Sequence, residues 1–150
     1  MTIRGRLIIV PAIAATAVLV SCVSRSDDTS AESKRAAAAL DWIRGAGKAA
    51  VVVHDATRSL LSDEITPARC ETAVADLDQT TEPAEVVEMI TKVPDATLRD
   101  ALSEEQGLFQ AVVSDCLQQL PPTSGMGAAE LRAALELVTV RLRQLEDAAR

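Results

Sequence analysis

Residues 128–150 read AAELRAALELVTVRLRQLEDAAR, and this final stretch decides the fold class of the chain. Its apolar residues recur at alternating spacings of four and three positions, which is the period of one face of an α-helix. The C-terminal seam that they form consists of Leu131, Leu135, Val138, Leu142 and Leu145. The seam has two interpretations: the core-facing side of a helix in the chain's own bundle, or a coiled-coil edge that binds a second protein.

The same helical period continues through most of the chain upstream. We expect helices over residues 30–62, 67–79, 83–93 and 96–120. Alanine fills 26 of the 150 positions, whereas Trp42 and Phe109 are the only aromatic residues. This composition favours helices, because strands prefer aromatic and β-branched residues. The sequence therefore predicts an all-α fold, a helical bundle of four to six helices, in one domain over residues 30–150.

Local sequence signals predict where these helices begin and break. Thr29 is expected to cap the first helix, because Glu32 follows three positions later as in a capping box. Gly45 and Gly47 lower helix stability and predict a kink or break within 30–62. An irregularity is expected within 96–120, around residues 103–107.

The first 21 residues differ from the rest of the chain. Arg4 and Arg6 precede a mostly apolar stretch of 13 residues without charge, from Leu7 to Leu19. A helix needs about 20 residues to cross a bilayer, so this stretch is too short to span one. Its length and its basic start are typical of a signal peptide.

The sequence Leu19-Val20-Ser21-Cys22 follows, and it resembles the lipobox of bacterial lipoprotein precursors at every position. The resemblance covers about the first 22 residues, and no family is recognised for the mature domain. It implies that residues 1–21 are a signal peptide and that Cys22 becomes the lipid-bearing N-terminus, with acyl chains such as palmitate. Residues 22–29 would then be the lipidated cysteine and a short tether. The alternatives are an uncleaved anchor and ordinary secretory cleavage nearby.

The three cysteines agree with this resemblance. An odd number of cysteines in an exported protein leaves one without a partner. If Cys22 carries lipid, Cys70 and Cys116 remain as a pair in an oxidising compartment, where disulfide bonds persist. We therefore expect one disulfide bond between them; two buried free thiols are the alternative.

The charge of the mature chain limits its partners. Removal of residues 1–21 takes away Arg4 and Arg6 and leaves 13 basic against 22 acidic residues, a net charge of −9. Phosphate backbones and anionic lipid surfaces repel such a domain, so we expect no nucleic-acid partner. Membrane attachment would come from a covalent lipid anchor.

His54 is the only histidine, and it lies on the apolar side of the expected helix 30–62. One histidine can serve as a haem ligand, a metal ligand or a general base. No other histidine or cysteine stands three or four positions away. We therefore favour a packed, hydrogen-bonded core residue, and we keep ligand binding as the alternative.

No other motif contains the full set of residues that its chemistry requires. The stretch Gly45-Ala46-Gly47-Lys48 resembles part of a phosphate-binding loop, but Trp42 and Ala49 stand where that loop needs Gly and Ser or Thr. The regularly spaced carboxylates Glu82, Glu85 and Glu88 are typical of a solvated helix face. We predict that the protein is not an enzyme and has no catalytic residue, metal site or cofactor.

The predicted function is a lipid-anchored binding or scaffolding module of the bacterial cell envelope. It would sit on the extracytoplasmic face of the cell membrane and bind another envelope protein, with the C-terminal seam as the candidate surface. The alternative is a carrier or sensor that binds haem, lipid or another apolar ligand in the bundle interior, with His54 as a candidate ligand. A cavity on the order of several hundred Å³ would favour the carrier.

Overall fold

The computed structural model describes the backbone of residues 24–118 and 126–150 and the side chains of 29–118 and 127–150. Every regular element within these ranges is helical, so the predicted all-α bundle is confirmed. The elements are α1 (Ser24–Arg44), the short 3-10 helix η1 (Lys48–Val51), α2 (Val52–Leu60), α3 (Pro67–Thr80), α4 (Pro83–Thr91), α5 (Ala96–Leu117) and α6 (Met126–Ala148). None of these described helices has the length and apolar character that a membrane span requires.

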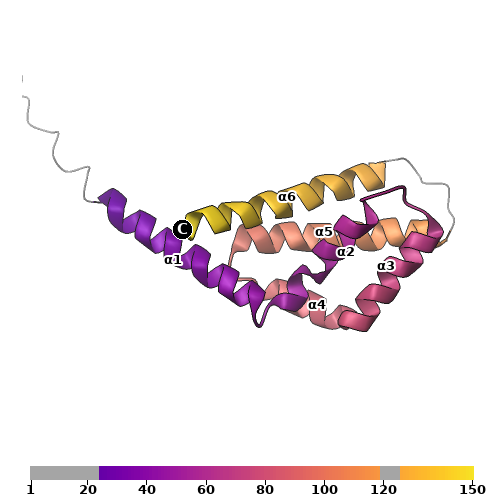
Figure 1. Ribbon diagram of the computed structural model, residues 1–150, viewed down its shortest axis with the longest axis horizontal. Helices are drawn as coiled ribbons and strands as arrows, with labels where there is room; N and C mark the ends of the chain where they lie inside the picture. Colours follow the sequence, from indigo (N-terminus) through magenta and orange to yellow (C-terminus); the bar gives the residue numbers. More distant parts are fainter. Residues whose placement is uncertain (1–23, 119–125) are drawn as a thin grey trace, which may run out of the picture.

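The two longest helices of the second half, α5 and α6, run side by side and form the long axis of the bundle (Figure 1). α1 packs against the C-terminal part of α6, and its first turns project beyond the other helices. α2 packs against α3 and α5, while α4 packs against η1 and α5. The core therefore lies between the second half of α1, α5, α6 and the shorter helices of the middle of the chain.

The expected break at the glycines is confirmed. α1 ends at Arg44, and Gly47 donates its backbone N–H to the carbonyl oxygen of Trp42 at 2.7 Å, which closes the turn into η1. Gly47 is buried with its Cα against the Trp42 ring, where an added methyl group would overlap ring atoms. Close approach of backbone and ring thus requires glycine at position 47.

Two local expectations are wrong. α1 begins at Ser24 and not after Thr29, so most of the expected tether is helical; neither glycine nor proline interrupts the chain between Ser24 and Arg44. α5 runs without interruption through residues 103–107. Gly107 is exposed there, and one glycine costs about 1 kcal/mol relative to alanine, too little to break a helix whose neighbours are packed in the core.

Side chains cap the start of α3 and of α5. Thr66 caps α3 by accepting the backbone N–H of Arg69 at 3.4 Å, and Pro67 occupies the first turn. Asp95 caps α5 through a 2.8 Å hydrogen bond from the backbone N–H of Leu98. The carboxylate of Asp95 also accepts two bonds from the Arg141 guanidinium, at 2.9 and 2.7 Å, which ties the start of α5 to α6.

Cys70 of α3 and Cys116 of α5 form a disulfide bond, with 6.5 Å between their Cα atoms. The predicted pairing is confirmed. The bond joins residues 46 positions apart, a separation that stabilises the fold by about 4 kcal/mol on the chain-entropy model. This contribution matters here because much of the core is small; its buried alanines are Ala36, Ala39, Ala50, Ala73 and Ala134.

Candidate functional site

A buried polar pair joins α2 to α5. The side chains of His54 and Glu105 are 2% and 1% exposed, and Nδ1 of His54 lies 3.0 Å from Oε2 of Glu105. On its other side, Nε2 of His54 lies 2.8 Å from Nη2 of Arg58, one turn further along α2. Because a guanidinium group only donates, Nε2 accepts this bond, and the ring hydrogen sits on Nδ1 and is donated to Glu105.

This arrangement decides between the two interpretations of His54. Its role as a packed, hydrogen-bonded core residue is confirmed. As a candidate ligand for haem or another group it is badly placed, because both ring nitrogens already have partners. A ligand would have to displace either Arg58 or Glu105, and the second displacement would leave a carboxylate unpaired in the core.

Glu105 was missed in the sequence, although a signal for it exists. It stands three positions after Leu102 and four before Phe109, both of which are buried. A carboxylate at that spacing lies on the apolar side of α5 and needs a buried partner. The sequence does not show which helix provides that partner.

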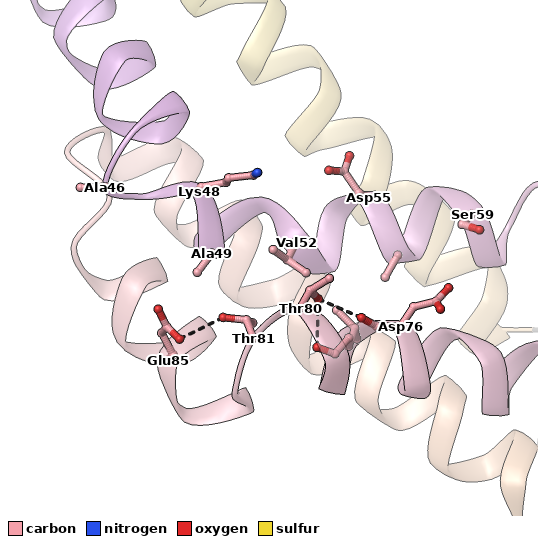
Figure 2. Close-up of a pocket in the computed structure, with 12 residues that line it drawn as sticks. Ala46, Lys48, Ala49, Val52, Asp55, Ser59, Asp76, Thr80, Thr81 and Glu85 are labelled. Atoms are coloured by element: carbon pink, nitrogen blue, oxygen red, sulfur yellow. Dashed lines mark hydrogen bonds between the residues drawn. The ribbon is translucent and has the colours of Figure 1, made fainter.

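Pockets of about 610 and 360 Å³ open at the surface of the bundle, and His54 lines neither of these two. The larger, about 610 Å³, lies between η1 and α2 on one side and the α3–α4 junction on the other (Figure 2). Its charged residues are Lys48, Asp55, Asp76 and Glu85. The hydroxyl groups of its two threonines already have hydrogen-bond partners. Thr81 donates to Glu85 at 3.0 Å, and Thr80 donates to backbone carbonyl oxygens at 2.9 Å.

The smaller pocket, about 360 Å³, lies between α2, α3, α4 and α5. We call it the apolar pocket, because its lining is mainly aliphatic and contains no charged side chain among the described residues. The lining residues are Val53, Val74, Leu77, Thr81, Pro83, Val86, Gln106, Phe109, Gln110, Val113, Ser114 and Leu117. An apolar pocket with a few polar groups is the usual form of a small-molecule site.

The C-terminal seam faces the core. Leu131, Val138 and Leu145 are buried, and Leu135 and Leu142 are partly buried. The interpretation of this seam as the chain's own bundle core is confirmed, and its interpretation as an exposed binding strip is wrong, because α5 and α1 cover it.

The exposed apolar residues of α6 lie on its opposite side. Leu137 and Val140 are 55% and 41% exposed, and the exposed Ala129 and Ala133 precede Leu137 at four-residue spacing. Because residues three or four positions apart share one helix face, these four residues form a continuous strip, the outer strip of α6. The sequence contained this second period, but the heptad spacing of the seam was the stronger pattern.

Other predicted site residues lie elsewhere. Cys22, the expected lipidation site, is outside the described residues. The carboxylates Glu82, Glu85 and Glu88 are exposed, as expected of a solvated face. Among the described residues no group of three or more His, Cys, Asp or Glu side chains is arranged to hold a metal ion.

No protein-family model matches the chain, and neither the curated proteins nor the solved structures contain a detectable relative. The candidate sites therefore rest on their own geometry.

Proposed function

We propose that this protein is a lipoprotein of the bacterial cell envelope whose helical domain binds another envelope protein at the extracytoplasmic face of the cell membrane. The first support is the N-terminal segment, which has a basic start, a short apolar stretch and the box that resembles a lipobox, Leu19-Val20-Ser21-Cys22. In this proposal residues 1–21 are removed and Cys22 carries the lipid.

The disulfide bond supports export. Cys70 and Cys116 are joined in one disulfide bond, so Cys22 is the single cysteine left over, and it is the last residue of the box. Structural disulfide bonds persist in oxidising compartments such as the outside of the cytoplasmic membrane.

The observation that carries the binding role is the outer strip of α6. Leu137 and Val140 are large apolar side chains exposed side by side on one helix, in a domain with a strong acidic excess. Burial of such a strip by a partner favours association, whereas the acidic faces around it keep the free domain soluble. The partner would lie along α6 without opening the core, since the C-terminal seam holds the other side of the helix.

Cross-linking in intact cells tests this role. We expect the wild-type protein to give a cross-linked species with a partner, and the double variant Leu137→Glu/Val140→Glu to reduce its yield at least about ten-fold, the equivalent of 1.4 kcal/mol. The matched control is Val87→Glu/Leu117→Glu, which makes the same two changes at exposed positions of α4 and α5.

The control double variant should keep the yield within about two-fold of the wild type. Equal yield from wild type and the α6 variant would refute the role of the outer strip. A species of twice the mass of the protein would make the partner a second copy of the chain.

The apolar pocket favours a second candidate function, a carrier of an apolar ligand. At about 360 Å³ it falls near the lower end of the range of small-molecule sites. The ligand would sit between α2, α3, α4 and α5, and not beside His54 as the sequence suggested.

A further inference from the structure

The outer strip of α6 lies at an edge of the bundle. α5, α1 and α2 contact α6, and the strip stays exposed on the side that they leave free (Figure 1). Burial of Leu137 and Val140 favours association with any apolar surface, because the hydrophobic effect is not directional. The charged residues that adjoin the strip define the partner more closely.

Four charged residues of α6 form a row beside the outer strip. Their spacings are four, seven and four positions, which places them on one side of the helix. We call this set the charged row; it consists of Arg132, Glu136, Arg143 and Asp147, and all four are exposed. The first three form no ion pair with the described residues, and Asp147 has only a 3.9 Å contact with Arg150. Their charges are therefore available to a partner.

The order of charges in the row is complementary to itself. The signs alternate from Arg132 to Asp147, positive, negative, positive, negative. When two copies of a helix run antiparallel about a two-fold axis, the same side of each helix faces the other. An axis halfway along the row brings Glu136 opposite Arg143 of the second copy and Arg132 opposite Asp147 of the second copy. Because the contact is symmetric, this one register places four pairs of opposite charge together.

The same register packs the outer strip against itself. The axis passes beside Val140, so Val140 of each copy lies next to Val140 of the other. Leu137 then falls between Val140 and Gln144 of the second copy, as a knob lies between neighbours of the facing helix. Ala133 has a small side chain and allows the two helices to approach closely. Charge pairing and apolar packing thus require the same arrangement.

A parallel pair of α6 helices lacks this complementarity. It would bring the charged row against the opposite side of the strip. On that side Glu130 is exposed, and Arg141 is already paired with Asp95 at 2.7 Å. Glu136 would therefore gain no free cation there.

We propose that the partner of the outer strip is a second copy of this chain, bound through an antiparallel contact between the two α6 helices. This inference rests on the proposed binding role of the strip and names its partner. The apolar strip provides the association free energy, whereas exposed ion pairs contribute little each and fix orientation and register. The charged row has no net charge, so two strongly acidic chains meet at a neutral surface.

Reversal of charge with rescue tests the register. The full-length protein is purified in detergent, and its dimer dissociation constant is measured by sedimentation equilibrium at low salt. Glu136→Arg places two arginines opposite Arg143 residues and should raise the dissociation constant at least about ten-fold. The double variant Glu136→Arg/Arg143→Glu restores opposite signs and should return within about three-fold of the wild type.

The matched control is Glu104→Arg, which makes the same change of charge at an exposed position of α5. It should leave the dissociation constant within about two-fold of the wild type. Dimerisation of the double variant also shows that the fold tolerates both substitutions.

Photo-cross-linking tests the direction of the helices. A diazirine amino acid replaces Ala133 in unlabelled protein, which is mixed with isotope-labelled wild type so that bonds between copies are recognised by mass. The antiparallel contact places this position near Gln144 and Asp147 of the second copy, so the cross-linked tryptic peptide should be 144–150. A cross-link to the peptide 133–141 of the second copy would indicate a parallel pair and overturn the proposal.

A wild type that stays monomeric up to about 0.1 mM would also overturn it, as would a dimer that Glu136→Arg does not weaken or that the double variant does not restore. The binding role of the outer strip fails separately. It stands if cells give a cross-linked species of another mass whose yield falls in Leu137→Glu/Val140→Glu, and the second copy alone is then excluded.

Discussion

His54 and Glu105 are 51 positions apart in the sequence and meet in the core, where Nδ1 of the imidazole lies 3.0 Å from Oε2 of the carboxylate. The pair connects α2 to α5, and Arg58 extends it to the surface of α2. A buried pair of this kind is costly to break, because removal of one partner leaves the other without compensation.

The first prediction concerns this pair. His54→Leu leaves Glu105 buried alone, and we expect it to lower the free energy of unfolding by about 3–5 kcal/mol. The double variant His54→Leu/Glu105→Leu replaces both polar groups by apolar ones of similar size and should recover most of that loss. Urea unfolding followed by circular dichroism measures both values. A double variant no more stable than His54→Leu would contradict the importance of the pair.

The second prediction concerns the pH dependence of stability. The hydrogen bonds from Arg141 lower the pKa of Asp95 below its ordinary value of 3.8. Since the folded state holds the charged form more strongly, the contribution is complete above that ordinary value and is lost as the pH falls through the lower, folded-state pKa.

Asp95→Asn removes the negative charge but keeps the helix cap, because asparagine still accepts the backbone N–H of Leu98. At pH 7 the variant should be less stable by about 1–2 kcal/mol, the loss of one charge-assisted hydrogen-bond pair. Below the folded-state pKa of Asp95 the two proteins should approach equal stability. Urea unfolding at several pH values measures this, and a difference that does not vary with pH would argue against the ion pair as its cause.

The third prediction uses two glycines as a matched pair. Gly47→Ala forces a methyl group into the Trp42 ring and should destabilise the protein by about 1–3 kcal/mol. At Gly107, apart from the adjacent residues and the backbone of the same helix, the methyl group would meet no described atom within 4 Å, and alanine there should stabilise α5 by up to about 1 kcal/mol. Thermal unfolding distinguishes the two signs, and a stabilising Gly47→Ala would show that the Trp42 contact is loose.

The fourth prediction concerns the anchor. In Cys22→Ser the thiol that receives lipid is absent, so the protein should leave the membrane fraction and accumulate as uncleaved precursor or in the medium. Ser21→Ala keeps a small residue before Cys22 and should remain in the membrane fraction. Fractionation with intact-mass measurement tests both, and an unmodified Cys22 in the mature wild type would exclude the anchor.

Most of the helices were predictable because their causes are local. The caps at Thr66 and Asp95 and the break at Gly45 and Gly47 depend on residues within a few positions of one another. The Cys70–Cys116 bond was predictable for another reason: once Cys22 is assigned to lipid, only two cysteines remain to pair.

The sequence by itself determined that the chain is helical, where most of its helices end and which cysteines are joined. Tertiary structure alone decided that Glu105 is the partner of His54, that the C-terminal seam is covered while Leu137 and Val140 stay exposed, and that Gln106 faces a pocket. A helical period shows that a face is apolar, but not which helix covers it. That depends on contacts between helices far apart in the sequence, and α6, apolar on two sides, has to bury one and leave the other to solvent or a partner.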